Sequence, residues 1–175
     1  GTHVDSHAYI QDARDLDAAF IVGQREFESN RHPDLVVGNS RAAIGPMASA
    51  MYGFPSSKMK LVGITGTNGK TTVSYLYSSI VRALSRHCFT MGTTGILLDG
   101  EKESDSQTTP DPLIIQKYFA DFLEEGVRDG AIEVSSHALD QFRVLGSYFA
   151  AVAFTNFSQD HLDYHNSMDE YFKAK

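Results

Sequence analysis

Several features that mark whole classes of proteins are scarce or missing in this 175-residue sequence. Its only cysteine, Cys88, excludes an internal disulfide framework and a metal site built from several cysteines, and we expect its thiol to be buried as a small hydrophobic group. Apolar stretches such as 149–154 fall far short of the roughly 20 residues that cross a bilayer, and no signal-peptide pattern is present. These absences predict a cytoplasmic protein without membrane insertion.

Positive charge is also in short supply. Fifteen Lys and Arg residues face 22 Asp and Glu residues, which gives a formal net charge of −7 and a pI near 5.4. Without a run of basic residues the chain cannot neutralise many backbone phosphates together, so binding to DNA or RNA is not expected. A local site for one phosphate-bearing ligand remains compatible with this balance, and the 42% hydrophobic content is typical of a globular protein.

We expect two domains that meet near residue 57, and the first, residues 1–57, is predicted to be a small α/β unit. Its expected elements are a helix over 7–16 capped by Asp5 or Ser6, a short buried strand over 18–23, a strand over 34–37, and a helix from Asn39 or Ser40 to about Tyr52. Residues 56–58 are small and polar, which is typical of a linker. Because the chain lacks an initial Met and stops within an expected helix, we expect a piece of a longer protein.

The second domain, residues 58–175, alternates strands with helices. Strands are expected over 61–65, 87–91, 130–134 and 151–155, and helices over 70–85, 112–125 and 168–175. This alternation predicts an α/β fold with a doubly wound, mostly parallel sheet. Residues 97–101 contain Asp99-Gly100, which predicts a hairpin turn that interrupts the alternation.

The strongest local signal is residues 63–72, Gly-Ile-Thr-Gly-Thr-Asn-Gly-Lys-Thr-Thr, between an expected strand and an expected helix. A glycine-rich turn at a helix N-terminus directs several backbone N–H groups at one point, where the helix dipole also favours an anion. Lys70 adds a cation for the β- and γ-phosphates, and Thr71 adds a hydroxyl for Mg²⁺. The segment departs from the strict phosphate-loop spacing because Ile64 stands where the first Gly belongs. We interpret it as a loop for a nucleoside triphosphate.

Two polar clusters follow later strands. Glu133 ends one strand, and because ligands collect at the carboxyl ends of strands, it could reach a metal at the phosphate loop; the alternative is a solvated acid at a strand end. Residues 160–165 hold two Asp and two His that could ligate a metal or relay protons, or could form a polar capping loop. The spacing alone leaves both alternatives open.

Taken together these motifs resemble one family, the Mur ligases. The segments that carry the resemblance are Thr65–Thr72, Gly92–Gly95, Thr108–Pro110, Glu133–Leu139, Arg143 and Asp160–His165, in that order, and Val4–His7 resembles the uridine-binding domain of the family. The sequence looks most like the branch that adds the third amino acid to UDP-N-acetylmuramoyl-L-alanyl-D-glutamate in peptidoglycan synthesis. The resemblance implies that residues 1–57 belong to a UDP-binding domain and 58–175 to an incomplete ATP-binding central domain.

The resemblance also implies roles for individual residues. Lys70 would bind the β- and γ-phosphates, Thr71 and Glu133 one Mg²⁺, and His161 a second Mg²⁺. Lys175 aligns with a lysine that is carbamylated at the second metal. The implied ATP-binding residues are Gly66, Thr67, Asn68, Gly69, Lys70, Thr71, Thr72 and Asn156, and the implied substrate-binding residues are Thr108, Thr109, Ser135 and Arg143. Gln159 replaces an Arg that is common in the family.

The implied reaction phosphorylates a carboxylate with ATP and then lets an amine attack the acyl phosphate. The implied partners are UDP-MurNAc-L-Ala-D-Glu and a diamino acid, either L-lysine or meso-diaminopimelate, with ATP and Mg²⁺ as cofactors. Alternatives are a cyanophycin or folylpolyglutamate synthetase, another phosphate-loop ATPase or kinase, and a nucleotide-binding fragment without activity. Residues 133–139 argue against the two synthetases, and together with residues 108–110 they argue against the ATPase or kinase. The fragment alternative stays open, and we expect the isolated 175-residue piece to be inactive. The oligomeric state has no signature in the sequence.

Overall fold

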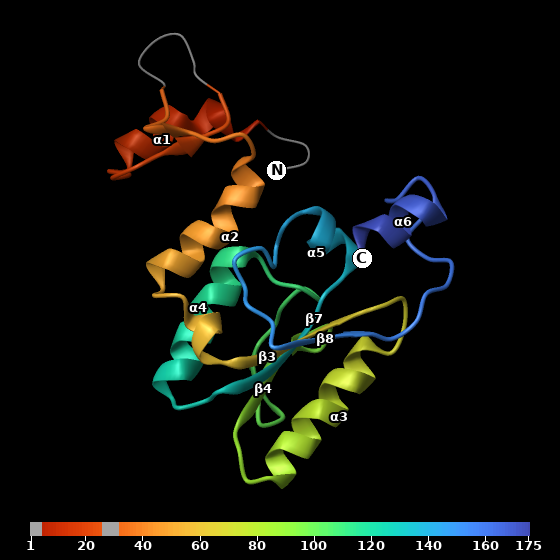
Figure 1. Ribbon diagram of the computed structural model, residues 1–175. Coiled ribbons are helices and arrows are strands. Elements are labelled where there is room, and N and C mark those ends of the chain that lie inside the picture. Colours follow the sequence, from red (N-terminus) through yellow and green to blue (C-terminus); the bar gives the residue numbers. More distant parts are fainter. Residues whose placement is uncertain (1–4, 26–31) are drawn as a thin grey trace. The chain divides into compact units, whose positions relative to one another are not determined.

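The computed structural model describes residues 5–25 and 32–175 (Figure 1). By its internal contacts the chain falls into two units, Gly1–Ala43 and Ile44–Lys175, which we describe separately. None of the helices in these described ranges has the length and apolar character needed to cross a membrane.

The first unit is smaller in regular structure than the sequence predicts. A 3-10 helix, η1 (Ser6–Tyr9), precedes a short α-helix, α1 (Ile10–Asp15), so the single helix expected over 7–16 is wrong. The Asp5 carboxylate accepts the His7 amide as the predicted cap. Tyr9, the last residue of η1, departs from α-helical dihedral angles and is the N-cap of α1. In the segment 4–7, which resembles the uridine-binding domain of the Mur ligases, residue 4 lies outside the described residues.

The two strands of this unit are short. β1 (Val22–Gly23) pairs in parallel with β2 (Leu35–Val36). The buried strand expected over 18–23 is therefore wrong in length, and Phe20 is exposed. The Asp34 carboxylate accepts the Ile21 amide at 2.6 Å, so a side chain occupies the place where a longer strand would pair.

Helix α2 (Ser40–Met51) begins and ends where the sequence predicts. The Asn39 side chain accepts the amides of Arg41 and Ala42 and caps its first turn. Gly53 and Phe54 adopt positive φ angles of 71° and 56° and end it. The following segment, η2 (Pro55–Lys58), corrects the linker predicted at 56–58, because Pro55 and Ser56 are buried and Ser56 Oγ accepts the Tyr148 amide at 3.0 Å.

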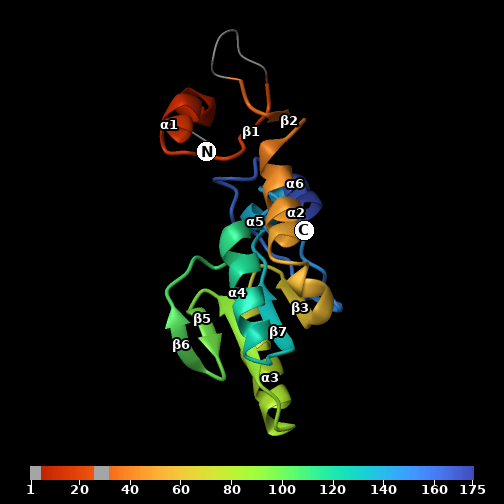
Figure 2. The same ribbon diagram turned by 90° about the vertical axis from the view of Figure 1, so that its left-hand side faces the viewer.

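In the described part of the second unit, six strands form one sheet in the order β6-β5-β4-β7-β3-β8. The strands are β3 (Lys60–Thr65), β4 (Cys88–Gly92), β5 (Gly95–Leu98), β6 (Glu101–Ser104), β7 (Asp129–Glu133) and β8 (Ala151–Phe154). β4, β7, β3 and β8 are mutually parallel, and β5 and β6 form the predicted antiparallel hairpin, seen beside β4 and α4 in Figure 2. The prediction of a mostly parallel sheet is confirmed.

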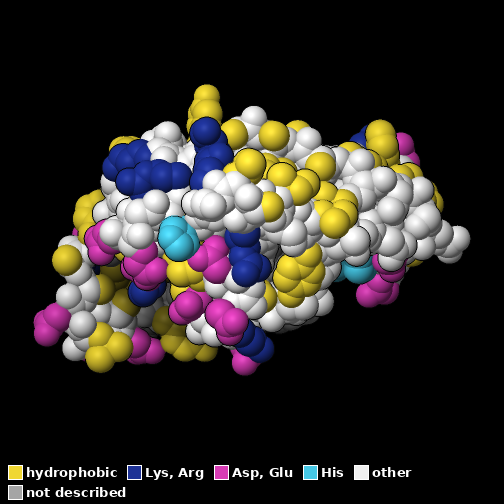
Figure 3. All heavy atoms as spheres, turned by 90° about the horizontal axis from the view of Figure 1, so that it is seen from below, with side chains coloured by type: hydrophobic (Ala, Val, Ile, Leu, Met, Phe, Trp, Pro, Cys, Tyr) yellow, Lys and Arg dark blue, Asp and Glu magenta, His cyan; other side chains and the backbone are white. Residues whose placement is uncertain are grey.

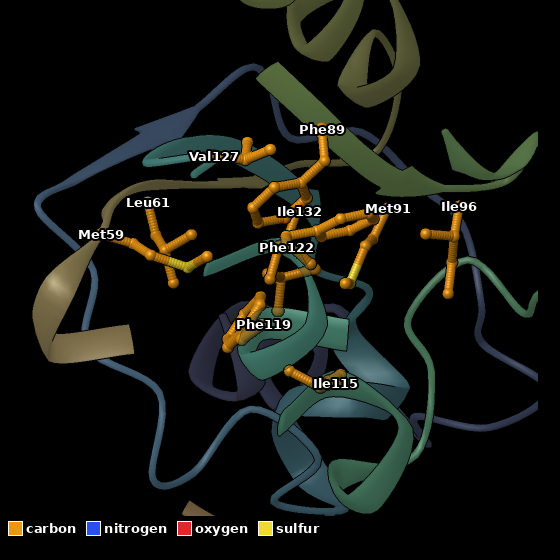
Figure 4. Close-up of a cluster of buried hydrophobic side chains, with 11 residues drawn as sticks. Met59, Leu61, Phe89, Met91, Ile96, Ile115, Phe119, Phe122, Val127 and Ile132 are labelled. Atoms are coloured by element: carbon orange, nitrogen blue, oxygen red, sulfur yellow. The ribbon is translucent and has the colours of Figure 1, made fainter. Parts of the chain in front are cut away.

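Helices cover both faces of this sheet (Figure 1). α3 (Lys70–Ala83) packs on one face of β3, β4 and β7, and α4 (Pro112–Glu124) on the other. On the α4 face, Phe89 and Ile132 meet Phe119 and Phe122 in the main hydrophobic core (Figure 4). On the α3 face the strands carry smaller and polar side chains, among them Cys88, which is fully buried as expected. Two shorter helices, α5 (Ser136–Asp140) and α6 (Met168–Ala174), follow β7 and β8.

A hollow lined by basic side chains lies at the end of the sheet where the parallel strands begin. Seen from below, this side of the molecule carries Lys and Arg side chains interspersed with Asp and Glu side chains (Figure 3). The hollow has a volume of about 620 Å³ and includes Lys58, Arg86 and Arg128 in its lining. Lys58 bonds the carbonyl of Gly53, Arg128 bonds that of Leu123, and Arg86 pairs with Asp129. Lys58 and Arg128 thus bond carbonyl groups at the ends of α2 and α4, and all three cations stabilise the fold. In open α/β sheets ligands bind at the opposite, carboxyl ends of the strands.

Candidate active site

The phosphate loop joins β3 to α3. Gly66 and Gly69 adopt φ angles of 138° and 84°, which side chains rarely tolerate, and a Cβ at Gly66 would lie 2.0 Å from the Thr155 hydroxyl. Gly69 occupies the N-cap of α3 without a side-chain cap, so the first amides of the helix are left to bind an anion.

Lys70 folds back over this loop. Its Nζ donates to the carbonyl oxygens of Gly66 and Thr67 at 2.8 and 2.9 Å. An ammonium has three N–H donors, so one donor remains for a phosphate oxygen next to the helix N-terminus. Partial burial lowers the pKa of Lys70, and the charges of Glu133 and Asp160 oppose that shift.

A segment that follows β8 braces the phosphate loop. The Asn156 side chain bonds Asn68 twice: its Oδ1 accepts the Asn68 amide at 3.0 Å, and its Nδ2 donates to the Asn68 carbonyl at 2.9 Å. The Asn156 carbonyl also accepts the Thr67 amide at 3.0 Å. Sequence reasoning placed Asn156 among the ATP-binding residues and missed this bracing contact, since nothing in the local sequence pairs two asparagines 88 positions apart.

Glu133 lies beside the start of α3. Its side chain is 1% exposed, so the alternative of a solvated strand-end acid is wrong. Its carboxylate accepts the Thr71 hydroxyl at 2.9 Å and both the amide and the hydroxyl of Thr93 at 3.2 Å. Gly92 leaves the space for it, because a Cβ there would lie 2.0 Å from Glu133 Oε1. The start of α3, the turn after β4 and the end of β7 thus meet at one buried carboxylate.

The four expected substrate residues lie next to Glu133. Thr109 Oγ1 donates to the Glu133 carbonyl at 2.8 Å and lies 3.4 Å from Ser135 Oγ. Arg143 Nη1 donates to the Thr109 carbonyl at 2.9 Å, and its other nitrogens contact Gln141. Thr108 Oγ1 is 3.2 Å from the Thr93 hydroxyl. The structure therefore brings these side chains together at the carboxyl end of β7.

The cluster at 160–165 does not form a compact metal site. His161 adopts a positive φ of 51° and packs its ring against His137, with ring centres 5.0 Å apart. Within the described residues no three His, Cys, Asp or Glu side chains are placed to hold one metal ion. The interpretation of 160–165 as a self-contained metal cluster is therefore not supported. Burial, followed by the nearby His161 and His165, lowers the pKa of His137.

Lys175 reaches the phosphate loop. Its Nζ donates to the Gly66 carbonyl at 3.0 Å and to Thr65 Oγ1 at 3.2 Å. The alternative of an exposed terminal lysine is wrong, because Lys175 is half-buried. Burial, helped by the charge of Lys70, lowers the pKa of Lys175 to about 8, so a larger fraction is the neutral amine than for an ordinary lysine.

Known proteins resemble the chain along its whole length. The Mur ligase middle domain matches residues 64–175. UDP-N-acetylmuramoyl-L-alanyl-D-glutamate–2,6-diaminopimelate ligases of Aquifex aeolicus and Listeria innocua are 39% and 44% identical over 175 residues, all of this chain. A solved structure of a ligase of that name superimposes with a TM-score of 0.79 at 26% identity, covering 96% of this chain and 34% of that one.

A more distant likeness concerns the fold alone. Folylpolyglutamate synthase of Mycobacterium tuberculosis, solved with ADP and AMPPCP, matches with a TM-score of 0.58 at 17% identity over 97% of this chain and 41% of that one. The chain spans 36% and 35% of the length of the two diaminopimelate ligases. The family match and the identities over the whole chain agree with the site geometry, and the chain belongs to the Mur ligase family.

Proposed function

We propose that this chain is the ATP-binding part of a ligase that joins diaminopimelate to UDP-N-acetylmuramoyl-L-alanyl-D-glutamate. The observation that carries the proposal is the contact between Thr71 and the buried Glu133 at the end of a loop whose lysine, Lys70, keeps a donor for phosphate. The relatives' identity over the whole chain supports the choice of reaction, and their name supports diaminopimelate over L-lysine.

ATP binding follows from the loop. The uncapped amides at the start of α3 would receive the phosphates, and the positive end of the helix dipole favours their charge. Lys70 would place its remaining donor on the β- and γ-phosphates. Of the residues predicted to bind ATP, Gly66 and Gly69 shape the loop through their positive φ angles. Thr67 and Asn68 are hydrogen-bonded to Ser158 and Asn156, which follow β8.

The residues at Glu133 fit Mg²⁺. The carboxylate and the Thr71 hydroxyl are hard oxygen donors of the kind that Mg²⁺ prefers, and they meet beside the phosphate loop. The absence of a side chain at Gly92 leaves room for the Glu133 carboxylate. When bound, Mg²⁺ neutralises the negative charge that develops on the transferred phosphoryl group. We propose Thr71 and Glu133 as its protein ligands.

The chemistry joins a carboxylate to an amine at the expense of ATP. The substrate carboxylate attacks the γ-phosphorus and ADP leaves; the amine then attacks the acyl carbon, phosphate leaves, and the nitrogen loses a proton. Both steps gather negative charge near the loop, where Lys70 and the helix N-terminus stabilise it. Neither step needs a covalent nucleophile from the enzyme.

The remaining predicted residues have proposed roles in the same reaction. We propose that Thr108, Thr109, Ser135 and Arg143 bind the UDP-linked substrate, and that residues 1–57 belong to its UDP-binding domain. His161 and a carbamate on Lys175 are proposed for a second Mg²⁺, and the lowered pKa of Lys175 supports reaction of its amine with CO₂. The cytoplasmic location and the role of Gln159 stay predictions.

The test is ligation by a full-length Mur ligase that carries this sequence. We expect Lys70→Ala to lower the rate of tripeptide formation by at least about a hundredfold, because transition-state charge stabilisation is lost while little packing changes. Lys117→Ala, which removes an exposed lysine paired with Asp121 on α4, is the control and should retain activity. Near-normal turnover in folded Lys70→Ala protein would contradict the proposal.

A nucleotide-binding fragment without ligase activity is the second candidate, and the short share of the relatives' length favours it for the 175-residue chain itself. ATP binding by this chain without ligation, beside activity of the full-length protein, would establish it.

A further inference from the structure

Tyr171 on α6 connects that helix to the phosphate loop from inside the protein. Its side chain is fully buried, and its ring stacks on Phe157 with ring centres 5.1 Å apart. Its hydroxyl lies 3.1 Å from Thr67 Oγ1, across 104 positions of sequence. The hydroxyl of a tyrosine that is buried this completely requires a partner, and Thr67 is the partner the structure gives it.

One direction of this contact gives every group around Thr67 Oγ1 a partner. A threonine hydroxyl has one proton and two acceptor lone pairs. Thr67 Oγ1 donates to the Ser158 carbonyl at 3.2 Å and accepts the Ser158 amide at 3.0 Å. With the Thr67 proton on the Ser158 carbonyl, the second lone pair of Thr67 Oγ1 accepts the Tyr171 hydroxyl. The Thr67 hydroxyl then has its full complement of bonds, and removal of the tyrosine hydroxyl leaves a buried lone pair unmet.

Thr67 lies at the turn of the phosphate loop, only 6% exposed. The next residue, Asn68, is held by Asn156, and the Lys70 ammonium bonds the Thr67 carbonyl itself. Displacement of Thr67 would therefore move the carbonyl that orients Lys70. It would also move the part of the loop that a phosphate group passes to reach the first amides of α3. Lys175, at the end of the same helix as Tyr171, contacts the loop one residue earlier, at Gly66.

We propose that Tyr171 is a positioning residue of the phosphate loop: its hydroxyl fixes Thr67 and thereby sets the loop conformation that receives ATP. The effect on ATP rests on the proposed function, whereas the effect on the loop does not. Tyr171 does not contact Thr71 or Glu133 in the described hydrogen bonds, so its loss should weaken ATP binding without abolishing the dependence on Mg²⁺.

The experiment compares Tyr171→Phe with Tyr118→Phe in this chain. Tyr118 lies on α4 and packs against Phe122, so its substitution removes a tyrosine hydroxyl away from the loop. Amide hydrogen exchange is measured without nucleotide, and ATP·Mg²⁺ affinity by calorimetry. We expect Tyr171→Phe to speed exchange at Asn68 and Ser158 by about tenfold and to weaken ATP by about fivefold to tenfold, with β7 amides and the Tyr118→Phe protein unchanged.

Unchanged exchange at Asn68 and Ser158 in folded Tyr171→Phe protein would overturn the proposal. Faster exchange at these amides in Tyr171→Phe, beside a folded wild-type chain that binds no ATP, would uphold the positioning role and contradict the proposed function instead. Thr67→Val removes the same hydrogen bond from the other side, together with the two bonds between Thr67 Oγ1 and Ser158. Exchange at Asn68 in this variant therefore tests the contact even where Tyr171→Phe does not fold. We expect the double variant to do no more than Thr67→Val alone, and fully additive effects would overturn the proposal.

Discussion

Gly92→Ala tests how tightly the fold encloses the Glu133 carboxylate. The added Cβ would lie 2.0 Å from Oε1 and 2.5 Å from Cδ of Glu133, where ordinary contact begins at 3.4 Å. The carboxylate must therefore move by more than about 1 Å. Because it is 1% exposed and bonded to Thr71 and Thr93, it cannot move without losing bonds that no water replaces.

We expect this substitution to lower the free energy of unfolding by about 2–4 kcal/mol, from overpacking and from weakened bonds to a charged acceptor. Urea unfolding measures this loss, and ATP titration with Mg²⁺ measures the accompanying loss of affinity. Gly38→Ala is the matched control, because no atom lies within 4 Å of its added Cβ, and it should change stability by less than about 1 kcal/mol. Wild-type stability and ATP affinity in Gly92→Ala would refute the reasoning.

Two further predictions concern Arg143 beside the proposed substrate site and the buried Cys88 of β4. In a full-length ligase, Arg143→Ala should raise KM for the UDP-linked substrate by about 10–100-fold with KM for ATP unchanged, because Arg143 shapes the Thr109 side of the site; equal effects on both KM values would contradict this. Burial raises the pKa of Cys88 to about 11. Iodoacetamide at pH 8 should therefore label the folded chain about a hundredfold more slowly than a free thiol. Because the folded state disfavours the thiolate, Cys88 makes its full contribution to the free energy of unfolding below the pKa of the unfolded thiol and loses it as pH rises toward 11. The free energy of unfolding should therefore fall more steeply with pH in this range for the wild type than for Cys88→Ala.

The sequence predicted the sheet and its loop well, because those signals are local. The strand before residue 66, the glycines and the helix after Gly69 each follow from short patterns, and α3 and α4 end within two residues of the prediction. The carboxyl-end rule for strands correctly brought Glu133 to the phosphate loop, since β3 and β7 are parallel neighbours.

The contacts that brace the loop could not be predicted in this way. Asn156 and Asn68, Tyr171 and Thr67, and Lys175 and Gly66 pair across 88 to 109 positions, and no pattern within either segment encodes its partner. The packed turn at 55–58 was likewise hidden, because its small polar residues look like a linker until Tyr148 is placed beside Ser56. In each case tertiary contacts decide what local composition leaves open.

The central claim, a nucleotide and Mg²⁺ site built from Lys70, Thr71 and Glu133, is tested most directly by calorimetry on this chain. ATP is titrated with and without Mg²⁺ into the wild type and Glu133→Gln, which keeps the side-chain shape and removes the charge. We predict that Mg²⁺ tightens ATP binding to the wild type by at least about tenfold and that Glu133→Gln loses this gain while its Mg²⁺-free affinity stays the same. An equal Mg²⁺ effect in both proteins, or a folded wild-type chain that binds no ATP, would contradict the account.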